Sequence, residues 1–282
     1  MTAPKADDPV IDTNEWTLCA QRYKDVIAKT TLFATTTLVD KLHAITPFTP
    51  TSSTIDIGCG TGSLTVSIHK KCNATKILAT DIAEGMLAEV DKLHLPNVST
   101  KQVDGATLAG IESDTFTHGV ASFTINFFPE PIHAVQSLHR VVKPNGLVGI
   151  AIWGERVEWT EAIGIAAKKL IPTYHFTTPE SPAAWHSERD HRAALESVGL
   201  KEVQTELVRM PLAVENADQI VDYVFRGGNP VMLHALKDFA AAGGDVAELE
   251  PVYAGVVRDM YPEGAVYADA VLGWGRKPEG ET

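Results

Sequence analysis

Residues 54–64, with the sequence TIDIGCGTGSL, constrain the fold more than any other stretch of the chain. A short apolar run that contains Asp56 leads into three glycines at alternate positions, and residues that can start a helix follow. Glycine is needed where the backbone takes a positive φ or where a ligand lies against the main chain. A strand, a glycine turn and a helix N-terminus in this order are typical of a nucleotide-type cleft at the carboxyl edge of a parallel sheet.

The glycine spacing argues against a dinucleotide in that cleft. The dinucleotide fingerprint is G-x-G-x-x-G, but here the third glycine is Gly62, and Ser63 stands where the fingerprint requires glycine. Asp56 lies just before the turn, where a carboxylate repels a pyrophosphate and attracts an ammonium group. The turn therefore favours a cofactor that carries an ammonium group.

The pattern after residue 54 predicts an α/β fold. Short apolar runs alternate with helical patterns, which is typical of βαβ units and a parallel sheet. We expect a mostly parallel seven-stranded sheet with helices on both faces. Six segments are expected along the chain: N-terminal lid helices over 1–50, a core over 51–153, a cap insertion over 154–189, a return to the core over 190–212, a helical cap insertion over 213–264, and a final core strand and tail over 265–282.

Composition excludes several classes of protein. The formal charge of −12 over 282 residues disfavours a nucleic-acid partner, because such proteins need a basic surface for phosphates. The cysteines Cys19, Cys59 and Cys72 form no C-x-x-C pair, so we expect neither a disulfide framework nor a metal site. No apolar run approaches the length of a membrane span or of a signal-peptide core. We therefore expect a cytoplasmic protein with no membrane partner.

The glycine stretch closely resembles motif I of the class I S-adenosylmethionine-dependent methyltransferases, whose cofactor bears a cation and no phosphate. The resemblance implies the Rossmann-like fold of that family, S-adenosylmethionine as cofactor and a small molecule as methyl acceptor. Asp81 lies 19 residues after Gly62, the approximate spacing of a ribose-binding acid. Asp104 follows the next strand and can accept from the adenine amino group, while Asp56 can hold the amino end of the methionine part.

The resemblance also assigns residues outside the three acids. Related enzymes cover the cofactor with N-terminal aromatics, so the helix carrying Trp16 and Tyr23 is either such a lid or a plain core helix. Backbone carbonyls near Ser122 and Phe123 can bind the ammonium group. The complete expected cofactor set is Trp16, Tyr23, Asp56, Gly58, Cys59, Gly60, Gly62, Asp81, Ile82, Met86, Asp104, Gly105, Ala106, Ser122 and Phe123.

The sequence says less about the acceptor. Phe128, Trp153 and Trp159 are candidates for a substrate pocket, although the tryptophans could equally pack the cap. A sulfonium methyl is already electrophilic, so a base is needed only for a protonated, weakly acidic nucleophile. No catalytic residue is identified; the weak candidates are His175, Tyr223 and His234.

A further resemblance concerns residues 140–147, RVVKPNGL, which are similar to the turn of the ubiquinone-biosynthesis-type branch with Asn145 in place of a glycine. Trp153, Trp159 and the segment 169–172 resemble fungal secondary-metabolite methyltransferases of the gliotoxin thiomethyltransferase type. These likenesses imply transfer of a methyl group to O, N or S of a secondary metabolite. Two alternatives stay open: an S-adenosylmethionine-binding protein that catalyses a pericyclic or isomerisation reaction, and a non-enzymatic regulatory subunit. The oligomeric state is not predicted.

Overall fold

A computed structural model describes residues 13–180, 184–214, 216–262 and 266–280, and every structural statement below concerns these residues. Within them, one sheet has the strand order β3-β2-β1-β4-β5-β7-β6. Strands β1 to β5 are parallel to one another, and β7 runs antiparallel to both β5 and β6. The strands are β1 (Ser53–Ile57), β2 (Lys76–Asp81), β3 (Val98–Gln102), β4 (Phe116–Ser122), β5 (Val142–Val157), β6 (Lys201–Pro211) and β7 (Tyr267–Arg276).

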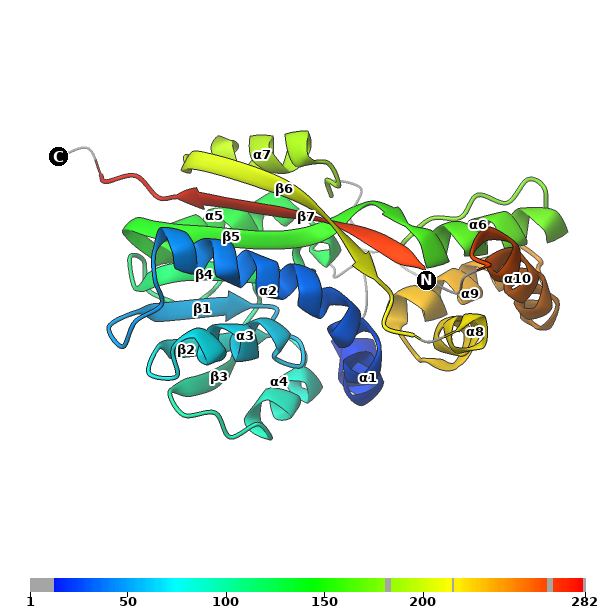
Figure 1. Ribbon diagram of the computed structural model, residues 1–282, viewed down its shortest axis with the longest axis horizontal. Coiled ribbons are helices and arrows are strands. Elements are labelled where there is room, and N and C mark those ends of the chain that lie inside the picture. The colour runs from blue at the N-terminus through cyan, green and yellow to red at the C-terminus, as the bar shows by residue number, and fades with distance from the viewer. Residues whose placement is uncertain (1–12, 181–183, 215, 263–265, 281–282) are drawn as a thin grey trace.

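Helices cover both faces of the sheet (Figure 1). One face carries α2 (Ile27–Ile45), α3 (Ser63–Lys71) and α4 (Glu84–Asp91). The other carries α5 (Pro131–Val141) and α7 (Glu188–Ser197). Buried apolar side chains from the sheet and the helices fill both layers. The predicted Rossmann-like fold with a mostly parallel seven-stranded sheet is therefore confirmed.

The layer under α2 depends on a glycine in the middle of β5. A Cβ atom on Gly149 would lie 2.6 Å from Leu42 Cδ1, closer than real carbon contacts allow. The absence of a side chain at this position lets α2 lie directly on the strand, where Leu38 and Leu42 are fully buried.

Helices gather beyond the carboxyl edge of the parallel strands (Figure 1). The helix α6 (Glu158–Leu170) continues directly from β5 and packs on α10 (Val246–Met260). With α8 (Ala217–Arg226) and α9 (Pro230–Ala241) they form what we call the cap. The N-terminal helix α1 (Thr13–Asp25) contacts α4 on one side and α9 on the other. The cap thus draws on two separate stretches of the chain that meet at one end of the sheet.

The turn that residues 140–147 resemble in the sequence does not precede β5. Pro144, Asn145 and Gly146 lie inside the strand, which already begins at Val142. Asn145 takes a φ of 65°, and the pairing register with β4 shifts at this place. The turn-forming residues therefore make an irregularity inside the strand, where the Asn145 N–H donates to Lys277 O (2.8 Å).

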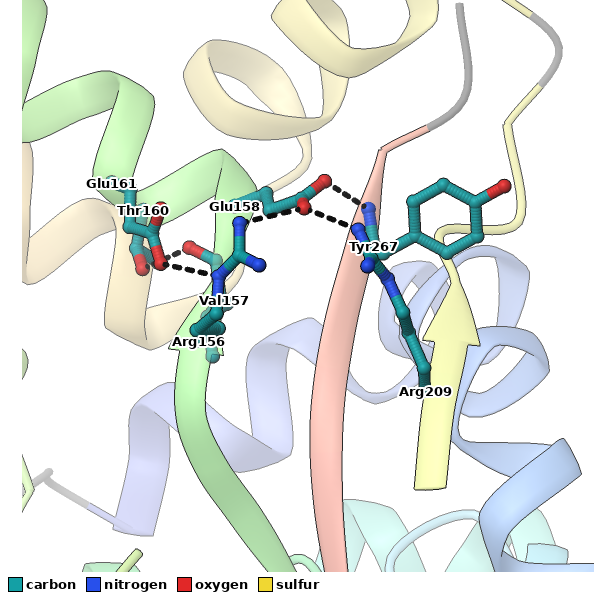
Figure 2. Close-up of polar contacts among 7 residues, drawn as sticks. All are labelled: Arg156, Val157, Glu158, Thr160, Glu161, Arg209 and Tyr267. Carbon is teal, nitrogen blue, oxygen red and sulfur yellow. Dashed lines mark hydrogen bonds and ion pairs between the residues drawn. The ribbon is translucent and has the colours of Figure 1, made fainter. Parts of the chain in front are cut away.

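A buried carboxylate fixes the point where the sheet becomes the cap (Figure 2). Glu158, the first residue of α6, accepts hydrogen bonds from Arg156 (3.2 Å) and Arg209 (2.8 Å) through Oε1. Its Oε2 accepts from the backbone N–H of Tyr267 at 2.8 Å. Glu158 is almost fully buried while both arginines are about half exposed, so the carboxylate joins the ends of β5, β6 and β7 from the inside.

We expect Glu158→Ala to lower the free energy of unfolding by about 1–3 kcal/mol, because the Tyr267 N–H and both guanidinium groups lose their common acceptor. Glu161→Gln is the control, because Glu161 contacts Arg156 only at 3.9 Å and is more than a third exposed. That variant should change stability by less than about 1 kcal/mol. Denaturant titration measures both, and equal losses in the two variants would contradict the role given to Glu158.

Candidate functional site

A cavity of about 480 Å³ opens at the carboxyl ends of β1, β2 and β4. It is bounded by the loops that follow these strands, by α1 and by the first part of α2. Every residue predicted from the sequence to bind the cofactor lines this cavity except Gly62. The topology therefore brings segments more than a hundred residues apart in the chain to a single place.

The glycine turn has the backbone shape that its sequence requires. Gly58 and Gly60 have φ values of 58° and 54°, in the left-handed region that favours glycine. A Cβ atom on Gly58 would also lie 2.1 Å from Thr124 Oγ1. Gly62 takes a φ of 94° as the residue before α3, and a Cβ there would lie 3.2 Å from a methyl group of Val90. Gly58 and Gly60 thus shape the cavity, whereas Gly62 lets α3 pack against α4.

Asp81, the last residue of β2, holds the turn in place. Its Oδ2 accepts from the Gly60 N–H and its Oδ1 from the Ala83 N–H, both at 2.9 Å. Burial raises the pKa of this carboxyl, while the two backbone hydrogen bonds act in the opposite direction. Since each carboxylate oxygen can accept more than one hydrogen bond, Asp81 can still receive two donors from a ligand.

Asp56 is fully buried below the glycine turn. Its Oδ2 accepts from Thr65 Oγ1 at 2.7 Å, but among the described residues Oδ1 has no hydrogen-bond partner. Burial, with a contribution from the nearby Asp81, raises the pKa of Asp56 to about 7. A buried carboxylate oxygen without a donor, in the wall of a cavity, is suited to a cationic or proton-donating ligand group.

Asp104, just after β3, brings a third carboxylate to the cavity. Its Oδ1 accepts from the Ala106 N–H (2.9 Å) and its Oδ2 from Thr107 Oγ1 (3.1 Å). These local bonds fix the side chain of Asp104, which is exposed whereas Asp56 is buried. The same cavity is lined by Ile82, 39% exposed, and by Met86, which is buried against α1.

Aromatic side chains close the cavity on the side of α1. The ring of Trp16 lies 6.0 Å from that of Tyr23 and 5.5 Å from that of Phe127, both in edge-on arrangements. Phe123, at the tip of β4, has a φ of 55° and lies 4.6 Å from the Trp153 ring. A phenylalanine in this region of φ is strained, a condition that concentrates at functional sites.

Several lining residues were not identified from the sequence. Phe127 and Thr124 belong to the same segment as Ser122 and Phe123, and their position after a strand end was the available signal. Thr35 lines the cavity from α2 and its Oγ1 lies 2.9 Å from Ser122 Oγ. Nothing in the sequence around Thr35 indicates this contact, because the two residues are 87 positions apart.

A second cavity, of about 50 Å³, lies between the first one and the cap. It shares Trp16, Tyr23 and Phe127 with the first cavity, so the three aromatics form a common wall. Its other lining residues are Ile27, Trp153, Val157, Trp159, Thr160, Thr178, Glu180, Tyr223, Asn229, Val231 and Met232.

The predicted substrate residues divide between the two cavities. Trp153 and Trp159 line the second, with rings 5.8 Å apart. Phe128 lines the first cavity instead, and its ring would lie 2.8 Å from a Cβ atom on Gly105. The cofactor cavity and the pocket candidates are therefore neighbours, with Phe128 on the cofactor side.

The three catalytic candidates are not brought together. Tyr223 is buried and lines the second cavity, and burial raises the pKa of its phenol well above its ordinary value. His175 and His234 are exposed and line neither cavity. Within the described ranges, no group of three His, Cys, Asp or Glu residues is placed to hold a metal ion. No described helix is long and apolar enough to cross a membrane.

Comparison with known proteins places the glycine turn and the three acids in a recognised domain. Residues 55–146 match the family model of a methyltransferase domain. Trans-aconitate 2-methyltransferase of Deinococcus radiodurans is 22% identical over 237 residues, covering 80% of this chain and 86% of the relative. The methyltransferase ucsB of an Acremonium species is 22% identical over 256 residues, covering 84% of this chain and 83% of the relative.

Solved structures agree on the fold. The YcgJ protein of Bacillus subtilis superposes with a TM-score of 0.55 at 16% identity, covering 86% of this chain and 99% of that one. The matched residues 55–146 contain the glycine turn, Asp56, Asp81 and Asp104, all of which line the larger cavity. The part of the chain that holds the glycine turn and the three acids is therefore similar to a methyltransferase domain.

Proposed function

We propose that the protein transfers a methyl group from S-adenosylmethionine to an O, N or S atom of a small molecule. The observation that carries the proposal is the row of three carboxylates, Asp56, Asp81 and Asp104, along one cavity of about 480 Å³. Each carboxylate differs in burial and in its free hydrogen-bonding capacity, and these differences match different parts of one adenosyl amino acid.

The residues present fit this cofactor. Asp56 has an unpartnered buried oxygen for the ammonium end, and Asp81 has capacity for two ribose hydroxyls. Asp104 is exposed and can accept from the adenine amino group, and Ile82 and Ala106 line the same cavity. Gly58 and Gly60 have no side chains, so the ligand could lie directly against their backbone.

Methyl transfer requires few reactive groups from the protein itself. S-adenosylmethionine supplies an electrophilic methyl group on a sulfonium, so the chain must hold the acceptor in line and exclude water. Trp16, Tyr23 and Phe127 separate the two cavities and are suited to both tasks. The acceptor would enter the second cavity, beside Trp153 and Trp159.

A small acceptor is favoured over a macromolecule. The net charge of −12 provides no basic surface for a nucleic acid, and the second cavity holds only a small group. Relatives named for one small molecule, trans-aconitate, and from a fungus, Acremonium, support the class. Membership of the ubiquinone-type branch and likeness to the gliotoxin thiomethyltransferase type are part of this proposal.

Transfer of a labelled methyl group tests the proposal. The protein is incubated with methyl-labelled S-adenosylmethionine and a panel of small phenols, amines and thiols. Labelled product together with S-adenosylhomocysteine supports methyl transfer. Cofactor binding without turnover on any class of acceptor would instead favour an isomerisation catalyst or a regulatory subunit.

Asp81→Ala should weaken cofactor binding by about 1.5–3 kcal/mol, the scale of hydrogen bonds to a charged group. The variant also frees the Gly60 N–H, so part of the loss would come from the turn. Asp222→Ala is the control, because Asp222 is 70% exposed on α8 and away from both cavities. Calorimetry with S-adenosylhomocysteine measures both affinities, and an unchanged value for Asp81→Ala would remove that residue from the site.

Asp56→Asn should stabilise the cofactor-free protein and weaken cofactor binding. The folded-state pKa of about 7 lies above the unfolded value of 3.8, so ionising Asp56 increasingly destabilises the fold as pH rises between these values. The variant should therefore gain about 1–4 kcal/mol at pH values above about 7, a gain that shrinks towards pH 4. Thermal melts across this pH range, with calorimetry for affinity, measure both effects. A gain independent of pH would contradict the assignment.

Trp16→Ala should lower cofactor affinity by about tenfold or more, because it removes a wall of both cavities. Leu18→Ala, on the same helix, is the control, because Leu18 is 85% exposed. Calorimetry and melting curves are measured for both variants. If Trp16→Ala keeps normal affinity but melts far below the control, α1 is a core helix and not a cofactor lid.

A further inference from the structure

The second cavity combines apolar walls with a single acid. Tryptophan, tyrosine, phenylalanine and aliphatic side chains supply most of its described lining, and Glu180 is the one carboxylate among them. The Glu180 side chain is only 13% exposed. A carboxylate kept in such surroundings needs a partner, because an isolated charge in an apolar site is costly.

His186 is that partner, and its orientation is fixed from the other side. Its Nε2 lies 3.2 Å from Glu180 Oε2, and its Nδ1 lies 3.1 Å from the backbone oxygen of Trp153. A carbonyl oxygen only accepts hydrogen bonds, so Nδ1 carries a proton. The contact between Nε2 and Oε2 then holds one further proton between the two side chains.

The surroundings make Glu180 the strongest base in this cavity. Burial raises the pKa of Glu180, while His186 and a hydrogen bond from Thr178 oppose that change. Tyr23 and Tyr223 face the same space, and burial raises the pKa of both phenols far above neutrality. The tyrosines therefore stay protonated, and a carboxylate with increased proton affinity is left to accept a proton at neutral pH.

We propose that Glu180, oriented by His186, binds the hydroxyl of an aromatic acceptor and takes its proton during methyl transfer. This inference rests on the proposed function. The aromatic walls fit a flat apolar molecule, and about 50 Å³ admits only its reacting end. The larger cavity meets this space along Trp16, Tyr23 and Phe127, so the hydroxyl would lie near the methyl donor.

The step balances without another reactant. The hydroxyl oxygen uses a lone pair to form the new bond to the methyl carbon, and the pair of the broken carbon–sulfur bond stays on sulfur. The hydroxyl proton passes to the Glu180 carboxylate. His186 acts only by orienting that carboxylate.

A binding measurement tests the hydroxyl contact without turnover. Para-fluorophenol and para-fluorotoluene have similar shapes, but only the phenol can donate to a carboxylate. Their dissociation constants are measured by fluorine NMR on the protein saturated with S-adenosylhomocysteine. We expect the preference for the phenol to fall about tenfold in Glu180→Gln, the scale of a hydrogen bond to a charged acceptor. Glu196→Gln, an exposed site on α7, makes the same change of charge and should leave the preference unchanged.

A kinetic comparison tests the proton transfer. Para-fluorothiophenol is largely ionised at mildly alkaline pH and reacts as a thiolate, so it needs no base. Para-fluorophenol remains protonated there. Glu180→Gln should slow methylation of the phenol by about 10²–10⁴-fold, the usual contribution of a general base, and change the thiol rate by only a few-fold. His186→Gln should shift the pH profile for the phenol and leave that of the thiol unchanged.

The outcomes separate this inference from the proposed function. An unchanged phenol preference in Glu180→Gln would overturn the inference, and so would an equal loss of rate for phenol and thiol. Methyl transfer that survives either result would leave the proposed function standing. A lost phenol preference without methyl transfer from the wild-type protein would instead count against the proposed function, because hydroxyl binding by Glu180 does not depend on it.

Discussion

The burial of two carboxylates at neighbouring strand ends shapes the whole site. Asp56 near the end of β1 and Asp81 at the end of β2 are both buried, and burial, with a smaller contribution from Asp81, raises the pKa of Asp56 to about 7. Backbone N–H groups satisfy Asp81, but one oxygen of Asp56 has no partner among the described residues. Burying the Asp56 carboxylate therefore costs stability, the trade of stability for binding that functional sites commonly show. The shape of the glycine turn depends on Asp81, because the Gly60 N–H donates a hydrogen bond to its carboxylate.

The second cavity depends on a different anchor, where β5, β6 and β7 meet the cap. Glu158 joins these three strands where the chain leaves the sheet for the cap. Its sequence neighbours Val157, Trp159 and Thr160 all line the second cavity. Part of the wall of that cavity is thus placed by a carboxylate that does not itself line it.

Local patterns were sufficient for the fold and for most of the cofactor cavity. Strands and acids at strand ends follow from short-range rules, so the sequence alone predicts that Asp56, Asp81 and Asp104 share one cavity. Contacts between distant, irregular segments cannot be predicted in this way. Glu180 and His186 meet Trp153 in a stretch without helical or strand periodicity, and Thr35 meets Ser122 across the fold. The turn expected around Asn145 is absent because the positive φ of this residue belongs to an irregularity inside β5.

The two cavities are mechanically connected through α1. Trp16 and Tyr23 from this helix belong to both walls, and α1 is packed so tightly on α4 that a Cβ atom on Gly85 would lie 2.7 Å from the Thr17 oxygen. The positions of Trp16 and Tyr23 in both walls therefore depend on the packing of one helix between α4 and α9.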